Sequence, residues 1–466
     1  MVRLMSKKIT ILILSLLFLP LAGFGCKGLS QTERQATQPV ALEYWTVFDD
    51  VDAIRALIEK YRAERPYLTV NVRQLRADEF NQRFIEALAE DRGPDIVSIH
   101  NRALRQYESK LSPMPSSAND VTIRIVEGKL GSQTIVNTRS RGLISPLQLD
   151  REYVQAVKND VIIGGKIYGL PLSLDTMAVY YNKDLLDRAG VAEPPKNWEE
   201  FQAAVKKMTR YDRKTGRILQ SGAALGTGNN IPNADDILYI LFKQSGLDFA
   251  TRNGLSVLNA VPQGGTRGEL SAAMQVVNFY TDFANSTRDT YTWNEDMDSA
   301  LDKFVNGSVG FLFGYSYHYP VIKARAPQLN VEILPLFQLN EDQRVNSANY
   351  WVQAVTQKSQ RKNEAWALID YLTHSEDTKQ YLDATNRPTA LRAFINAQSE
   401  QPELAPFVSQ TLVSDNWYKG KDYQTASRAI STMLREWLQT PPDPDKEIEW
   451  RQEILNRAAA RVNQTL

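Results

Sequence analysis

The stretch LEYWTVFDDVDAIRALIEKYRAERPYLTVNV, residues 42–72, decides the fold class of this chain. Its two ends, residues 42–47 and 68–72, are rich in the β-branched and aromatic side chains that favour strands. Between them, apolar side chains recur at the i, i+3, i+4 and i+7 spacing of a helix that packs one face on a sheet, at Ile54, Leu57, Ile58 and Tyr61. Pro66 ends this helix. The pattern therefore predicts two parallel strands joined by a covering helix.

The same pattern continues along the chain. Phe80, Phe84 and Leu88 indicate a second helix, which ends before Gly93-Pro94. The segment from Asp95 to Ile99 is typical of a third strand. Three strands that alternate with two helices predict an α/β fold with a parallel sheet and covering helices.

Length, charge and cysteine content exclude several other classes of protein. At 466 residues, the chain is long enough for two or more hydrophobic cores. Its 54 Lys+Arg balance 54 Asp+Glu, which argues against a nucleic-acid partner, since such proteins need a dense basic face. Cys26 is the one cysteine, so the chain forms no internal disulfide and no cysteine-ligated zinc site. We expect neither a metal nor a cofactor.

The first residues have the features of an export signal. Arg3, Lys7 and Lys8 precede an apolar run over residues 9–22, which is short for a membrane span. Cys26 follows this run after Gly23-Phe24-Gly25, and this arrangement resembles a bacterial lipoprotein signal. We therefore expect a signal peptide over 1–25, lipidation of Cys26 and a flexible tether over 26–40. The alternative is a plain export signal with an incidental cysteine. Either way the folded part lies on the extracytoplasmic side, and lipidation predicts anchoring at the cell membrane.

Four further segments are informative. They are GKIYGLPLSLDTMAVYYNKDLL at 165–186, PPKNWEEF at 194–201, FVNGSVGF at 304–311 and AWALIDYL at 365–372. Asn197 is placed to cap the helix that begins at Trp198. Residues 113–145 contain Pro113 and Pro115 and predict a loop-rich insertion.

Together these segments resemble the family 1 extracellular solute-binding proteins of ABC importers, the family that includes maltose-binding protein. The resemblance runs from about Leu42 to the C-terminus and implies two α/β lobes, each a mainly parallel sheet with covering helices, with a ligand cleft between them. It also implies crossings between the lobes near 175–179, 333–336 and 383–387. Lobe 1 would comprise 41–177 plus 336–383, and lobe 2 would comprise 178–335 plus 384–466.

Candidate binding residues of lobe 1 follow strands or the first crossing, because ligands of α/β sheets bind at the carboxyl ends of strands. Trp45 offers an aromatic face, with a core position as the alternative, and Asp49 is either a ligand contact or a helix cap. His100 and Asn101 follow the third strand, and Asp175 lies at the crossing where the family often presents a carboxylate.

Candidate binding residues of lobe 2 are amides and aromatic side chains, which suit the hydroxyls and rings of sugars. They are Asn229, Asn230, Tyr315, Tyr317 and Trp417, and Trp351, in the later part of lobe 1, is a further aromatic candidate. Core positions remain the alternative for the aromatic residues. Arg387 either pairs with an anionic group or lies in solvent.

The resemblance implies a receptor that captures a mono- or oligosaccharide by hinge closure and delivers it to the permease subunits of an ABC importer, with polyols or sugar phosphates as alternative ligands. No G-x-S-x-G, H-E-x-x-H or Walker-type motif occurs, so we do not expect an enzyme. Two alternatives stay open: a solute sensor without transport, and a membrane-tethered glycoside hydrolase, which would need a pair of carboxylates.

Overall fold

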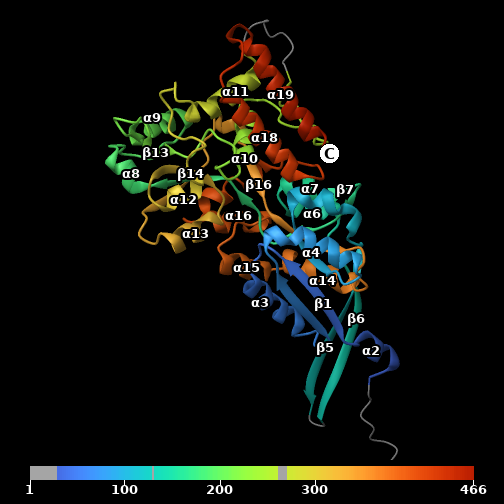
Figure 1. Ribbon diagram of the computed structural model, residues 1–466. Helices are drawn as coiled ribbons and strands as arrows, with labels where there is room; N and C mark the ends of the chain where they lie inside the picture. Colours follow the sequence, from blue (N-terminus) through green and yellow to red (C-terminus); the bar gives the residue numbers. More distant parts are fainter. Residues whose placement is uncertain (1–28, 129–130, 261–269) are drawn as a thin grey trace, which may run out of the picture.

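The computed structural model describes residues 29–128, 131–260 and 270–466, and they form two α/β lobes, each with its own hydrophobic core. Lobe 1 is built on the sheet that begins at Val40, and lobe 2 on the sheet that begins at Ala178. Figure 1 shows lobe 2 in the upper part of the view and lobe 1 below it. The predicted two-lobed α/β class is confirmed.

The sheet of lobe 1 has the strand order β2-β1-β3-β17-β4, with β9 paired to β17. The strands are β1 (Val40–Thr46), β2 (Leu68–Gln74), β3 (Ile96–His100), β4 (Leu111–Ser112), β9 (Leu170–Pro171) and β17 (Trp351–Thr356). β1 is parallel to β2 and β3, as predicted, but β17 is antiparallel to β3, β4 and β9. The sheet is mixed rather than mainly parallel, because β17 enters lobe 1 from lobe 2 and runs back along β3.

The helices of lobe 1 cover this sheet. They are α3 (Val51–Arg62), α4 (Ala77–Ala89), α5 (Leu104–Tyr107), α6 (Pro146–Glu152), α7 (Gln155–Val161), α14 (Lys362–His374), α15 (Thr378–Thr385) and α16 (Arg392–Ser399). The apolar positions predicted for α3 and α4 are all buried. Asp50, not Asp49, caps α3, since its carboxylate accepts from the Ala53 amide at 2.9 Å. A two-stranded ribbon, β7 (Ile162–Ile163) with β8 (Lys166–Ile167), follows α7.

The sheet of lobe 2 has the order β12-β13-β14-β11-β15. Its strands are β11 (Ala178–Asn182), β12 (Arg210–Tyr211), β13 (Ile218–Ala223), β14 (Val309–Gly314) and β15 (Val331–Pro335). β13 and β14 are parallel and the other pairs are antiparallel, so the expectation of a mainly parallel sheet is wrong here. The reason is that β11 leads into lobe 2, whereas both of its neighbours lead back to the junction of the lobes.

The helices of lobe 2 are α8 (Lys183–Arg188), α9 (Trp198–Met208), α10 (Ala234–Gln244), α11 (Ala272–Thr281), α12 (Ala300–Val305), α13 (His318–Arg325), α18 (Tyr423–Trp437) and α19 (Glu447–Asn463). Asn197 caps α9 as predicted, accepting from the Glu200 amide at 2.9 Å. In Figure 1, α18 and α19 lie side by side at the end of lobe 2 away from α13.

The lobes are joined by a three-stranded sheet, called the hinge sheet below. It has the order β10-β16-β18, with β10 (Asp175–Thr176), β16 (Asn346–Asn349) and β18 (Ser414–Asp415). The chain leaves the core of lobe 1 after Leu174, returns to it at Ala348 and leaves it again after Val408. The short helix α17 (Ala405–Val408) precedes the last passage.

Two of the expected crossings lie elsewhere. Residues 333–336 still belong to lobe 2, because Leu336 and Phe337 are buried in its core. The crossing expected at 383–387 is wrong by more than twenty residues, since Leu391 and Ile395 of the α16 region are buried in lobe 1. Residues 384–404 therefore pack with lobe 1, although we had assigned them to lobe 2.

Residues 113–145 are not a loop-rich insertion. They contain a long antiparallel hairpin of β5 (Ser117–Gly128) and β6 (Gly131–Gly142), paired in register along their full length. The two prolines that indicated loops precede the hairpin, and the alternating β-branched residues Val121, Ile123 and Ile125 were the overlooked strand signal. Figure 1 shows the hairpin extending beyond the body of lobe 1. Ile125, in its outer part, is 71% exposed.

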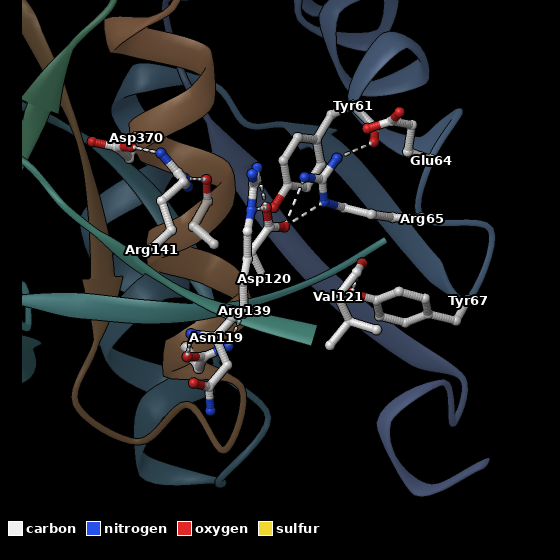
Figure 2. A network of polar contacts seen from close by, with 12 residues as sticks. Tyr61, Glu64, Arg65, Tyr67, Asn119, Asp120, Val121, Arg139, Arg141 and Asp370 are labelled. Atoms are coloured by element: carbon white, nitrogen blue, oxygen red, sulfur yellow. Dashed lines mark hydrogen bonds and ion pairs between the residues drawn. The ribbon is translucent and has the colours of Figure 1, made fainter. Parts of the chain in front are cut away.

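Polar contacts fix the base of this hairpin to lobe 1 (Figure 2). Asp120 is buried and pairs with Arg65 at 2.7 Å and with Arg139 at 3.2 Å. Arg141 pairs with Asp370 of α14, and the Tyr67 hydroxyl donates to the carbonyl of Val121 at 3.1 Å. The hairpin is therefore held at one end only.

The predicted signal peptide and Cys26 lie outside the described residues. The described part of the expected tether contains a short helix, α2 (Gln31–Ala36), capped by reciprocal bonds between Ser30 and Glu33. This helix buries none of its residues. In the described part of the chain, no helix combines the length and the apolar character that crossing a bilayer demands.

Candidate functional site

Aromatic side chains of both lobes meet beside the hinge sheet. Phe48 follows β1 of lobe 1, and its ring lies 5.3 Å from the ring of Tyr317 of lobe 2, edge to face. Trp351, the first residue of β17, stacks on Phe48 at 6.0 Å. The Arg387 guanidinium lies 4.0 Å from the centre of the Phe48 ring. Flat apolar faces next to a cation form a surface suited to a ring-shaped polar ligand.

Asp175 links the hinge sheet to lobe 2. Its carboxylate accepts from the amide and hydroxyl of Ser316 at 2.8 and 2.6 Å, and from the Thr176 amide at 2.9 Å. Burial raises the pKa of Asp175 to about 6, although these hydrogen bonds work in the opposite direction. Asp175 thus holds the turn between β14 and α13 in place.

A second contact between the lobes is an ion pair. Arg102, which follows β3, donates to Asp236 of α10 at 2.5 Å, and both side chains are buried. Arg102 also donates to the Tyr423 hydroxyl at 2.6 Å and to the Ser347 hydroxyl at 3.3 Å. Tyr315 and Ser347 donate to Asp236 at 2.7 and 2.9 Å. The positive charge of Arg102 in lobe 1 and the negative charge of Asp236 in lobe 2 therefore neutralise each other within the protein.

Asp235 and His100 lie beside this ion pair. Tyr423 donates to Asp235 at 2.7 Å, and burial together with the charge of Asp236 raises the pKa of Asp235. Burial and the positive charge of Arg102 lower the pKa of His100 to about 4, so its ring is neutral at pH 7. Among the described residues no group of three or more potential metal ligands is present.

Two pockets lie between the lobes, and they share Tyr317 and Arg387 as walls. The smaller has a volume of about 10 Å³ and is lined by Phe48, Asp49, Ser173, Asp175, Tyr317, Asn349, Tyr350, Trp351, Arg387 and Pro388. The larger has a volume of about 210 Å³ and is lined by Ser316, Tyr317, Tyr319, Pro320, Lys323, Thr385, Asn386, Arg387, Glu403, Leu404 and Phe407. Pockets for ligands of drug size have volumes of roughly 300–1,000 Å³. The lobes must therefore separate before an oligosaccharide can enter.

The structure brings five of the predicted residues to this region. Asp49, Asp175, Tyr317 and Trp351 line one or both pockets, and His100 lies against Trp351 with ring centres 5.4 Å apart. The His100 ring also makes a hydrogen bond of 3.0 Å to the Asn349 side chain. Asp49 is buried, and it accepts from Thr46 and Ser98 at 2.9 and 2.6 Å.

Three other predicted residues are buried and have internal partners. Trp45 lies in the core of lobe 1, because the last three residues of β1 are all buried. Asn101 donates to Asp160 at 2.9 Å. Tyr315 is fully buried and holds Asp236, as described above.

The remaining predictions do not belong to this region. Asn229 contacts Glu295, and Asn230 bonds the carbonyls of Asn294 and Met297, so both amides order a loop of lobe 2. Trp417 is buried in the core of lobe 2, with its ring 5.2 Å from that of Phe249.

Phe48, Asp236 and Tyr423 are the main residues absent from our predictions. Phe48 directly precedes Asp49 at the end of β1, so its position in the sequence was a signal that we overlooked. Asp236 lies in the first turn of a helix, where an acidic residue is ordinarily explained by the helix dipole.

Two lobes, a hinge of crossing strands and aromatic and charged walls between the lobes define a hinge-bending binding protein. The chain belongs to the bacterial extracellular solute-binding protein family, whose profile it matches over residues 56–406. The expected resemblance is thus confirmed, and the folded part is extracytoplasmic. The family comprises binding proteins, in agreement with our expectation that the chain is not an enzyme.

Similar proteins agree with this assignment. A putative binding protein of Brucella abortus is 24% identical over 249 residues, which cover 52% of this chain and 57% of that protein. The chain therefore spans just over half the length of this curated relative.

Solved structures share the fold. The tagatose-bound ABC transporter solute-binding protein of Thermotoga lettingae has a TM-score of 0.64 and 17% identity, covering 91% of this chain and 99% of that one. A cyclo/maltodextrin-binding protein complexed with maltotetraose has a TM-score of 0.65 and 14% identity, covering 92% and 97%.

Proposed function

We propose that this protein is an extracytoplasmic receptor that captures a saccharide between its lobes and delivers it to the permease subunits of an ABC importer. The observation that carries the proposal is the meeting of Phe48 and Trp351 with Tyr317 across the junction of the lobes. Aromatic faces of this kind stack on the apolar faces of sugar rings. The saccharide ligands of the structural neighbours support the same class of ligand.

The mechanism follows from the hinge. When the lobes separate, the aromatic residues of lobe 1 and Tyr317 of lobe 2 become accessible on opposite walls. A saccharide that contacts both walls stabilises the closed state, because it binds that state more tightly than the open one. No covalent step and no cofactor is involved.

We further propose that Cys26 carries a lipid which holds the receptor at the cell membrane, near the permease. The basis is the sequence of residues 1–26 alone. Cys26→Ser should transfer the protein from the membrane fraction to the soluble fraction, whereas continued membrane association would exclude this anchor.

The binding proposal is tested by titrating the purified protein with neutral and acidic oligosaccharides, polyols and amino acids in a calorimeter. We expect saturable binding of one saccharide class. At a concentration about 100-fold above Kd, this ligand should add roughly 2.7 kcal/mol and raise Tm by a few degrees. Binding of an amino acid and of no saccharide would refute the proposal.

Variants connect binding to the site. Trp351→Ala and Phe48→Ala should each weaken saccharide binding at least ten-fold. Tyr211→Ala is the matched control, since Tyr211 is a half-exposed aromatic residue on edge strand β12, far from both pockets. Transport is tested separately by uptake of the labelled ligand in cells of the source organism with and without the gene of this protein; tight binding without an effect on uptake would favour a sensor.

A further inference from the structure

Two cations of the larger pocket have no anionic partner. Within the described residues, neither the Arg387 guanidinium nor the Lys323 ammonium forms an ion pair of 4.0 Å or less with a carboxylate, although the charge of Arg387 acts to lower the pKa of Asp175 in the smaller pocket. Instead, each lies near an aromatic ring, Arg387 at 4.0 Å from that of Phe48 and Lys323 at 5.6 Å from that of Tyr319. Both residues are partly exposed and line the pocket.

The carboxylates of the two pockets, in contrast, already accept hydrogen bonds. Asp175 accepts three, from Ser316 and Thr176. Asp49 accepts from Thr46, Ser98 and Gln353. Glu403, which is exposed at the outer rim, accepts from the Asn386 amide at 3.0 Å. Arg387 and Lys323 form no such contact with a carboxylate, and by their chemistry they offer about five N–H donors on the guanidinium and about three on the ammonium.

The hydrogen-bonding capacity of these two cations determines which ligand group they can bind. A neutral sugar hydroxyl both donates and accepts, so it can also bind a carboxylate that has a free oxygen. The two cations can only donate, so the ligand group that contacts them must supply acceptors. A carboxylate or phosphate supplies them with a negative charge, and the planar guanidinium matches either one through two parallel hydrogen bonds.

We propose that the receptor selects an acidic saccharide, whose carboxylate or phosphate pairs with Arg387 and Lys323 while its ring packs on the adjacent aromatic faces. This inference rests on the function proposed above and adds the charge of the ligand. Arg387 provides the bidentate contact from the lobe 1 side, and Lys323 closes on the same group from α13 of lobe 2. The anion thereby connects the two lobes.

The test uses matched ligands with the purified wild-type protein. Each neutral oligosaccharide of the calorimetric panel is paired with its uronate, oxidised to a carboxylate at C6, and with its C6 phosphate. We expect an acidic member to bind at least ten-fold more tightly than its neutral counterpart. Raising NaCl from about 0.05 to 0.5 M should reduce this preference, because salt screens accessible charges. The preferred acidic member shows whether carboxylate or phosphate is the natural group.

Arg387→Gln should abolish the preference for the acidic member, and Lys323→Gln should reduce it. Arg73→Gln is the matched control, since Arg73 is also exposed and lies over an aromatic ring, that of Trp45 at 5.4 Å, but lines neither pocket. Neutral saccharides that bind as tightly as their acidic partners would overturn this inference while leaving the receptor function intact. Binding of no saccharide at all would overturn both. A preference that survives in Arg387→Gln would also refute the role of Arg387.

Discussion

Arg102 and Arg387 both lie at the junction of the lobes, but their surroundings are opposite. Arg102 is 3% exposed, and its charge is neutralised by Asp236 at 2.5 Å with tyrosine and serine hydroxyls around it. Arg387 is partly exposed, packs on the Phe48 ring and has no carboxylate partner among the described residues. The first arginine holds the lobes together, whereas the second is available to a ligand.

The comparison shows why burial and charge must be judged together. A buried cation without a counter-charge is strongly unfavourable, so Arg102 and Asp236 require each other. A partly exposed cation is solvated by water and requires no protein partner. An unpaired cation can therefore persist only at the accessible edge of the interface, which is also where a ligand enters.

The largest effect is expected for Asp236→Ala. It leaves the buried Arg102 without its counter-charge and should lower the free energy of unfolding by about 3–5 kcal/mol. Urea denaturation measures this loss. Asp302→Ala, which removes an exposed ion pair with Arg325 at 2.7 Å, is the control and should change stability by less than about 1 kcal/mol. Equal losses of stability in the two variants would contradict the idea that a buried ion pair matters more for stability than an exposed one.

The next effect concerns Asp175, which has neutral donors where Asp236 has an arginine. Because burial raises its pKa from 3.8 to about 6, the folded protein keeps this proton at pH values where the unfolded chain releases it. The stability that this group contributes is fully present below pH 4 and is lost as the pH rises through 6. A shift of this size corresponds to about 3 kcal/mol.

Urea unfolding at several pH values between about 4 and 7 tests this prediction. Stability of the wild type should decline with rising pH, and Asp175→Asn should flatten the decline. Asp160→Asn should act in the same direction, since burial also raises the pKa of Asp160 to about 6. An unchanged slope in Asp175→Asn would show that its carboxyl titrates normally.

A smaller effect is expected for Phe48→Ala. The variant loses two aromatic contacts and the platform under Arg387, which together should amount to about 1–2 kcal/mol of stability. Since Tyr317 belongs to the other lobe, the variant should also populate open states and show a larger radius of gyration by X-ray scattering. Unchanged dimensions would mean that Phe48 does not hold the lobes together.

The smallest effect on stability is expected for Arg387→Ala. It removes one accessible contact between a cation and a ring, worth about 0.5–1 kcal/mol. Urea denaturation of Arg387→Ala and of Asp236→Ala under the same conditions compares the stability contributed at Arg387 with that contributed at Arg102. A loss above about 3 kcal/mol would show that Arg387, like Arg102, has a structural role.

Much of the fold could be predicted from local patterns. The spacing of Ile54, Leu57, Ile58 and Tyr61 identified α3, and their aromatic side chains made Tyr317 and Trp351 candidates for the site. The lobe boundaries were harder to predict, because α16 has an amphipathic pattern that would fit either lobe. Which lobe it packs on depends on contacts with residues that are distant in sequence.

Other features had no local signal. Arg102 and Asp236 are separated by more than a hundred residues, and each by itself resembles an ordinary surface charge. The hairpin β5–β6, by contrast, did carry a strand signal in the alternation of Val121, Ile123 and Ile125, and we missed it because Pro113 and Pro115 indicated loops. Asn229 and Asn230 looked like ligand contacts because amides that order a loop and amides that bind sugar have the same sequence appearance.

The hinge sheet has a consequence for the thermodynamics of capture. A single connecting segment would let the lobes bend, twist and slide past each other, whereas three connecting strands bonded side by side resist twisting and sliding. Opening is thus confined largely to one angular coordinate. Little orientational entropy remains to be lost when the lobes close on a ligand, so more of the contact energy is retained as affinity.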